Sequence, residues 1–186
     1  MNESIRQTVF ASLMAALIAA GAFLSIPIGP VPIVLQNFFV LLTGLLLGSR
    51  QGTVAVGIYL LAGAVGLPVF AGATGGIARF VGPTGGYLLG YLPAVWIAGR
   101  FSEAGRGRLA FDLAGLALGS LVVYAAGVPM LKAVAGMDWG RAVAVGMLPF
   151  LPGDILKIAA VVPVARTLRP VLDGAVGREA HGDSGS

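Results

Sequence analysis

The first long apolar run of the chain, residues 8–26, constrains the fold because it is long enough to cross a lipid bilayer. A spanning helix needs roughly 20 mostly apolar residues to cover a hydrocarbon core about 30 Å thick. The run is too long for the apolar region of a signal peptide, and no clear cleavage site follows it. Charged residues make up only 11% of the chain, whereas soluble domains carry about a quarter. These features predict an all-α membrane protein.

Five more apolar runs follow, so the sequence predicts six transmembrane helices in one domain over residues 1–170. The runs cover residues 33–47, 53–67, 87–99, 109–128 and about 142–168. Pro149, Pro152 and Gly153 interrupt the last run, because proline removes a backbone donor and restricts φ. Residues 171–186 are expected to form a polar C-terminal tail.

The positive residues are divided unevenly between the two sides that six spans would create. One side would carry Arg6, Arg50, Arg100, Arg106, Arg108, Arg166, Arg169 and Arg178, and the other Arg79, Lys132 and Arg141. Lysine and arginine are in excess in cytoplasmic loops. Both termini of this multi-pass chain are therefore expected on the cytoplasmic side.

The three connections on the opposite, outward side are rich in Pro and Gly and nearly uncharged. They cover residues 27–32, 68–86 and about 129–149. Irregular backbone at membrane depth is tolerated only where it is buried in protein or lines a cavity. These connections are therefore predicted to form a lid or the wall of a cavity.

Asp154 and Lys157 are charged residues inside the last apolar run, and their spacing puts them on one helix face. Lys157 precedes Arg166 by nine residues, or about 13 Å of helix, which is less than half of the hydrocarbon core. Charges at that depth are costly and indicate function. We interpret the pair as a polar pocket floor with an acceptor and a donor. In the alternative, Asp154 only caps a helix and Lys157 is its ion-pair partner.

Three other polar residues are candidates for ligand contacts. Arg79 is the single charge of the second outward connection, and a guanidinium matches a carboxylate in bidentate fashion. An interfacial arginine that holds the loop is the alternative. Gln36 and Asn37 open the second span, where amides either contact a ligand or form interhelical hydrogen bonds.

The first span carries a stripe of small residues, Ala11, Ala15 and Ala19, at four-residue spacing. Ser12, Ala16 and Ala20 lie alongside. Such a smooth stripe lets another helix approach closely. That helix belongs either to this chain or to a partner protein, and spacing alone does not decide between them.

Several functions lack their sequence features. The net charge of +4 comes from scattered arginines, which argues against a nucleic-acid partner. No Gly-Lys pair occurs, so a P-loop is absent and this route of ATP hydrolysis is excluded. There is no cysteine, no metal-ligand cluster and no nucleophile–base pair, and His181 falls in the tail. We therefore predict neither catalytic residues, nor a metal, nor a cofactor; the oligomeric state, a homo-oligomer included, stays open.

Motifs along the chain resemble those of the BioY family, the biotin-specific substrate-binding (S) components of energy-coupling factor (ECF) transporters. They are GPVPI at 29–33, LQN at 35–37, GLPVF at 66–70, GPTGGYL at 82–88, and LPGD at 151–154 with Lys157. The resemblance extends from the first span to about Arg169. Several motifs in the same order are far more specific than any one of them alone.

The resemblance implies a six-helix S-component fold in a bacterial or archaeal cytoplasmic membrane, with outward loops closing a biotin pocket. It implies that a separate transmembrane T component and paired ATPases supply the energy, and that Ala11, Ala15 and Ala19 dock the T component. It also adds Thr84 and Tyr87 to the substrate-binding set of Asp154, Lys157, Arg79, Gln36 and Asn37.

Biotin fits these residues chemically, since its ureido ring has two N–H donors and one carbonyl acceptor. We hypothesise that Asp154 accepts from the ureido N–H groups, that Lys157 donates to the carbonyl, and that Arg79 binds the tail carboxylate. An S component for another vitamin, such as thiamin or riboflavin, would share the fold. A membrane-embedded enzyme using the Asp154–Lys157 pair is a further alternative, whereas no continuous polar stripe indicates a channel.

Overall fold

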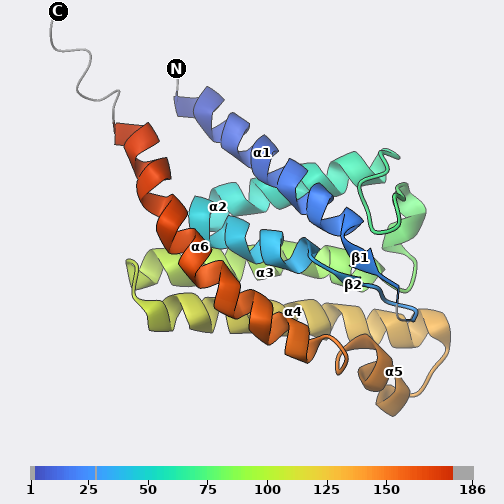
Figure 1. Cartoon of the computed structure of the whole chain (residues 1–186). Helices are drawn as coiled ribbons and strands as arrows, with labels where there is room; N and C mark the ends of the chain where they lie inside the picture. The colour runs from blue at the N-terminus through green and yellow to red at the C-terminus, as the bar shows by residue number, and fades with distance from the viewer. Residues whose placement is uncertain (1–2, 28, 178–186) are drawn as a thin grey trace, which may run out of the picture.

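The computed structural model describes residues 3–27 and 29–177, which form a helical bundle with a small hairpin at one end (Figure 1). The elements are α1 Glu3–Phe23, β1 Ser25–Ile26, β2 Ile33–Val34, α2 Gln36–Ala64, the 3₁₀ helix η1 Ile77–Phe80, α3 Gly85–Gly105, α4 Leu109–Ala135, α5 Trp139–Gly146 and α6 Leu151–Gly177. The all-α architecture agrees with the prediction.

Helix α2 contains two of the predicted spans as arms that double back on each other at Gly48 (Figure 1). Gly48 has φ 74° and ψ −176°, a backbone region that is essentially open only to glycine. The Glu103 side chain closes the bend, because its Oε1 accepts hydrogen bonds from Ser49 N at 2.6 Å and Ser49 Oγ at 3.0 Å. A Cβ on Gly99 would lie 2.3 Å from Ser49 N, so glycine lets α3 pack directly against this bend.

One predicted helix boundary is wrong, because the helix continues further than expected. Helix α4 continues through Pro129 to Ala135, and α5 occupies most of the rest of the connection expected at 129–149. Proline is tolerated within membrane helices because neighbouring groups satisfy the freed carbonyl. Helix α6 runs to Gly177, and a polar tail over residues 171–186 stays a prediction.

Helix α5 begins at a well-formed cap. Asp138 is the N-cap residue, and its side chain accepts a hydrogen bond from Arg141 N at 3.0 Å. This bond lowers the pKa of the Asp138 carboxyl below its ordinary value. The cap starts a short helix that leads the chain back from α4 toward α6.

By length and composition, three of the described helices could each cross a membrane: α1 from Ile5, α2 and α4. The pair α5 and α6, bent by 43°, would be a fourth. Because α2 contains two arms, this result does not decide how many times the chain crosses. Six crossings and cytoplasmic termini stay predictions.

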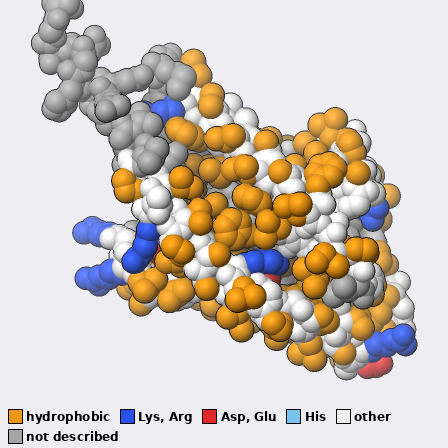
Figure 2. All heavy atoms as spheres, viewed as in Figure 1, with side chains coloured by type: hydrophobic (Ala, Val, Ile, Leu, Met, Phe, Trp, Pro, Cys, Tyr) orange, Lys and Arg blue, Asp and Glu red, His pale blue; other side chains and the backbone are white. Residues whose placement is uncertain are grey.

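The outer surface of the bundle is apolar. Hydrophobic side chains cover most of the face shown in Figure 2. Leu61, Val65 and Leu156 are 67%, 80% and 72% exposed, and water would disfavour such exposure in a contiguous surface. A lipid environment accounts for it, because lipid tails are as apolar as leucine.

A polar cluster joins four helices at the end of the bundle opposite the hairpin. The Arg169 guanidinium on α6 forms two 3.1 Å hydrogen bonds with the carboxylate of Asp112 on α4, which is 1% exposed. It also donates to Ser102 Oγ on α3 at 2.6 Å and to Leu45 O on α2 at 3.3 Å. Asp112 lies in a predicted span, so its charge was a signal that the sequence analysis missed.

Candidate ligand-binding site

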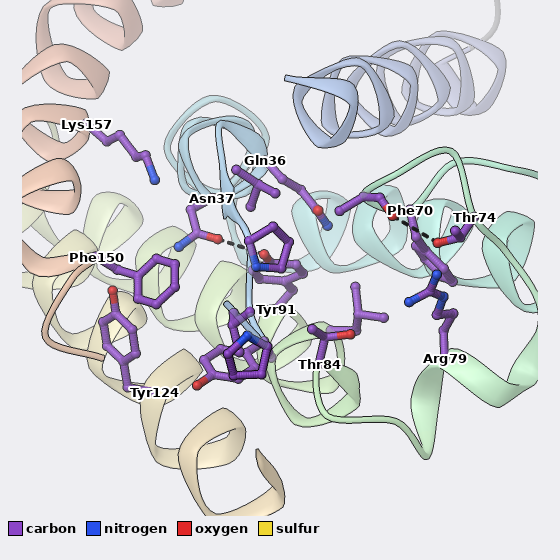
Figure 3. Close-up of a pocket in the computed structure, with 17 residues that line it drawn as sticks. Gln36, Asn37, Phe70, Thr74, Arg79, Thr84, Tyr91, Tyr124, Phe150 and Lys157 are labelled. Atoms are coloured by element: carbon purple, nitrogen blue, oxygen red, sulfur yellow. Dashed lines mark hydrogen bonds between the residues drawn. The ribbon is translucent and has the colours of Figure 1, made fainter. Parts of the chain in front are cut away.

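A cavity lies at the hairpin end of the bundle, where the outward connections meet the ends of the helices (Figure 3). It contains about 790 Å³ of space free of protein atoms, open solvent at its mouth included. Its wall is formed by Pro30, Val31, Pro32, Val34, Gln36, Asn37, Phe70, Ala71, Thr74, Arg79, Thr84, Tyr87, Leu88, Tyr91, Tyr124, Phe150 and Lys157. Mostly apolar walls with a few polar groups are typical of small-molecule sites.

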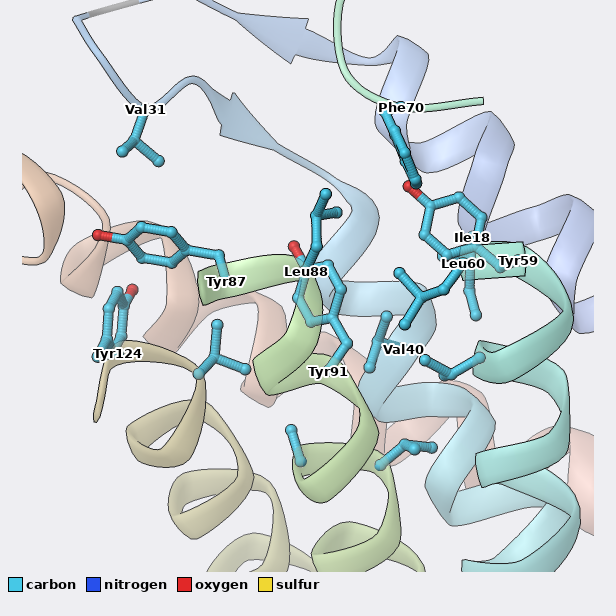
Figure 4. Close-up of a cluster of buried hydrophobic side chains, with 14 of the residues drawn as sticks. Ile18, Val31, Val40, Tyr59, Leu60, Phe70, Tyr87, Leu88, Tyr91 and Tyr124 are labelled. Carbon is cyan, nitrogen blue, oxygen red and sulfur yellow. The ribbon is translucent and has the colours of Figure 1, made fainter. Parts of the chain in front are cut away.

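Aromatic rings make up much of the wall and continue into the core beneath it. Tyr87, Tyr91 and Tyr124 are buried and belong to the cluster shown in Figure 4. Phe70 packs edge-to-face against Tyr59, with ring centroids 5.5 Å apart. The wall is therefore anchored to the tightly packed part of the bundle, which favours a preformed cavity.

At one end of the cavity, Lys157, Asp154 and Tyr124 form a hydrogen-bonded chain. Lys157 Nζ donates to Asp154 Oδ1 at 3.1 Å, and the Tyr124 hydroxyl donates to Asp154 Oδ2. Lys157 and Tyr124 line the cavity, whereas Asp154 is 5% exposed and lies behind them. Asp154 sits within the first turn of α6, since its N–H donates to Phe150 O at 2.8 Å, so it is not the N-cap residue.

The two amide side chains at the start of α2 are held by tyrosines. The Tyr91 hydroxyl donates to Asn37 Oδ1 at 2.7 Å, and Gln36 Nε2 donates to the Tyr59 hydroxyl at 2.8 Å. The second bond joins the two arms of α2. The predicted interhelical hydrogen bonds are therefore present, and each amide also lines the cavity, so the predicted ligand contact stays open.

Arg79 lies on η1 across the cavity from Lys157 (Figure 3). Its side chain is exposed, and within residues 5–27 and 29–170 the structure gives its guanidinium no ion-pair partner. Thr84 precedes α3 and lines the same region, while the Tyr87 hydroxyl donates to Gly146 O at 2.7 Å. The cavity thus has a cationic group at each of two opposite ends.

Six of the seven predicted substrate-binding residues line the cavity, and the seventh, Asp154, contacts two lining residues. Binding of a ligand by these residues remains a prediction. Two lining tyrosines, Tyr91 and Tyr124, were not among the predicted residues. Tyrosines within apolar spans were an available signal, because a buried hydroxyl needs a partner.

The predicted docking stripe on α1 faces inward in part. Ala11 is fully buried and Ala15 is 6% exposed, both packed inside the chain, and Ala19 is half-buried. The small residues alongside them, Ser12, Ala16 and Ala20, are exposed. Ala11 and Ala15 therefore pack against side chains of this chain, and docking of the T component by the stripe stays a prediction. Within the described residues, no group of three His, Asp or Glu side chains could hold a metal ion.

With helices of this kind around a cavity that carries polar groups at its ends, the chain falls in the class of helical membrane proteins with a small-molecule site. The model of the BioY family matches residues 1–174, and the chain belongs to this family. The predicted fold class is thereby confirmed.

Curated relatives and a solved structure agree with this assignment. The biotin transporter BioY of Thermotoga maritima is 42% identical over 165 residues, which cover 89% of this chain and 96% of that protein. The biotin transporter BioY of Rhizobium etli is 41% identical over 165 residues, with 83% and 88% covered. The crystal structure of the S-component for biotin from an ECF-type ABC transporter superposes with a TM-score of 0.83 at 33% identity, over 91% of this chain and 95% of that one.

Proposed function

We propose that the chain binds biotin and takes it up across the cytoplasmic membrane as the substrate-specific S component of an ECF-type transporter. The observation that carries the proposal is the cavity of this BioY-family chain, with the Lys157–Asp154 pair at one end and, at the other, Arg79, which has no ion-pair partner within residues 5–27 and 29–170. An elongated ligand with a polar ring and an anionic tail fits that arrangement.

Each part of biotin has a matching group in the cavity. Lys157 donates to the ureido carbonyl, and Asp154 accepts from a ureido N–H through lone pairs that Tyr124 and Lys157 leave open. The aromatic and proline side chains of the wall contact the apolar ring carbons and the aliphatic tail. Arg79 binds the tail carboxylate in a bidentate, charge-assisted contact. Gln36, Asn37, Thr84 and Tyr87 complete the contact set.

We infer that the energy for uptake comes from other proteins. The sequence has no Gly-Lys pair with which to build a P-loop. A separate T component and a pair of ATPases would supply the energy. The T component would approach α1 along its stripe of small residues, Ala11, Ala15 and Ala19, together with the exposed Ser12, Ala16 and Ala20 alongside it.

Titration of the purified chain in detergent with biotin tests the proposed function. We expect saturable binding of biotin that neither thiamin nor riboflavin displaces. Asp154→Ala and Lys157→Ala should each weaken binding, measured on protein shown to be folded by its thermal transition. The proposal would be wrong if the folded chain did not bind biotin, or if it bound thiamin or riboflavin instead.

A further inference from the structure

The tyrosines around the cavity share a feature that binding of a ligand alone does not require. Each of three of the four tyrosine hydroxyls forms a hydrogen bond with a different polar side chain. The pairs are Tyr59 with Gln36, Tyr91 with Asn37, and Tyr124 with Asp154. The three tyrosines come from the second arm of α2, from α3 and from α4. The fourth, Tyr87, donates instead to a backbone carbonyl.

In the structure the Tyr91 hydroxyl donates to Oδ1 of Asn37, which leaves the Nδ2 half of the amide to face the cavity. An amide has an acceptor oxygen and a donor nitrogen that exchange places when it turns over. With Oδ1 held by the Tyr91 hydroxyl, Nδ2 points to the side of the cavity where the Lys157 amine lies (Figure 3). The structure gives Nδ2 no hydrogen bond to any other side chain within residues 29–170. Two donors therefore face the same space, which suits a carbonyl oxygen.

The bond from Tyr124 acts in the same way on Asp154. A carboxylate accepts about four hydrogen bonds, two at each oxygen. Tyr124 engages Oδ2 and Lys157 engages Oδ1, so rotation of the carboxylate would break two bonds at once. Asp154 is 5% exposed, and at such a site water replaces a lost bond poorly. The remaining lone pairs are thereby held in a fixed direction, which suits an N–H donor.

We propose that Tyr91 and Tyr124 are positioning residues: Tyr91 holds the donor half of Asn37 toward the cavity, and Tyr124 holds the carboxylate of Asp154, directly behind the cavity wall, in one orientation. The site then selects a molecule whose carbonyl faces Asn37 and Lys157 and whose N–H faces Asp154. This inference rests on the proposed binding of biotin, because the ureido group is the part of the ligand that it concerns.

Biotin analogues that change one hydrogen-bonding group test each tyrosine. In 2-iminobiotin an N–H group replaces the ureido carbonyl oxygen, and in a cyclic carbamate analogue a ring oxygen replaces one ureido N–H. Wild-type protein should bind both analogues more weakly than biotin. In Tyr91→Phe the Asn37 amide is free to turn over, so the ratio of the Kd for 2-iminobiotin to that for biotin should fall about tenfold. In Tyr124→Phe the corresponding ratio for the carbamate should fall by about the same factor.

Thr43→Val is the control, since it removes a buried hydroxyl outside the cavity wall whose bond goes to the backbone carbonyl of Phe39. Both Kd ratios should keep their wild-type values in this variant, whatever happens to its stability. A structural role of Tyr91 and Tyr124 would lower the thermal transition and leave the ratios unchanged, and that result in a folded variant would overturn the inference. Tyr91→Phe decides on its own where Tyr124→Phe yields no folded protein. Wild-type protein that does not bind biotin would instead reject the proposed function.

Discussion

The ion pair of Lys157 and Asp154 is the residue-level feature that the sequence marked most clearly. Its members are 13% and 7% exposed, so each removes the cost of burying the other. Removing one partner of a buried pair costs about 3–5 kcal/mol, whereas replacing both with apolar residues is often neutral. Stability and ligand binding can therefore be separated at this site.

We expect Lys157→Met alone to lower the thermal transition of the chain in detergent, because Asp154 is left buried without its cation. The double variant Asp154→Leu, Lys157→Met should recover most of the loss and still fail to bind biotin. Thermal unfolding and biotin titration on the same samples measure the two effects. A double variant that is stable and binds biotin as wild type does would refute a role of the pair in binding.

Arg79 allows a test of the other end of the cavity, because its guanidinium is exposed and holds no ion pair among the described side chains. Arg79→Gln should weaken binding of biotin about tenfold and leave binding of biotin amide, which lacks the carboxylate charge, nearly unchanged. Arg79→Lys keeps the positive charge but cannot form the bidentate contact with a carboxylate. Its loss of biotin affinity should therefore be smaller than that of Arg79→Gln. Equal losses for biotin and its amide would argue that Arg79 holds the loop instead.

At the scale of elements, the bend of α2 depends on one glycine. Alanine at position 48 would have φ near 74°, a conformation that costs about 1–3 kcal/mol for a residue with a side chain. Its Cβ would also lie 2.5 Å from Glu103 Oε1, the atom that closes the bend. Gly48→Ala should therefore lower the thermal transition.

Gly57→Ala is the control for this prediction, since Gly57 lies within the second arm of α2 and a Cβ there meets nothing within 4 Å. Alanine is favoured over glycine in a helix by about 1 kcal/mol, so this variant should be as stable as wild type or more stable. Equal destabilisation by both substitutions would mean that the bend at Gly48 is not the cause.

The helices were predictable where apolar runs were long, and the ends of the helices were not. Runs at 33–47 and 53–67 predicted both arms of α2, but not that a single residue separates them. In the structure Gly48 is the one non-helical residue inside α2, and its positive φ is enough to reverse the direction of the helix. At Pro129 the error is the opposite, since α4 continues past a proline that the sequence analysis took as its end.

The site was predictable to the extent that charge in an apolar run is rare. Lys157, Asp154 and Arg79 stand out for this reason. The hydrogen bonds of Tyr91 and Tyr124 could not be predicted, because they join residues 54 and 30 positions apart and depend on how α2, α3, α4 and α6 pack. For the same reason, spacing alone could not decide which side of α1 was buried.

At the scale of the whole molecule, Arg169 connects the helices at the end opposite the cavity. It follows Lys157 by twelve residues on α6, or about 18 Å. Arg169→Ala would leave the Asp112 carboxylate buried and unpaired, so we expect a loss of about 3 kcal/mol in the free energy of unfolding, with little change in biotin affinity of the folded protein. Arg166→Ala should have little effect on stability, because Arg166 is exposed and makes a single 3.3 Å hydrogen bond. A large loss of biotin affinity in folded Arg169→Ala would instead show that the Arg169 cluster is energetically coupled to the cavity.

The predicted orientation of the molecule can be tested directly because the chain has no cysteine, so each introduced thiol is unique. Ala78 on η1 and Ala104 near the end of α3 are both exposed, at the cavity end and at the arginine-rich end. The excess of arginine predicts that the second end is cytoplasmic. In intact cells, a membrane-impermeant maleimide should therefore label Ala78→Cys and reach Ala104→Cys only after lysis. The reverse pattern would turn the cavity toward the cytoplasm, and a ligand taken up from outside could not then enter it directly.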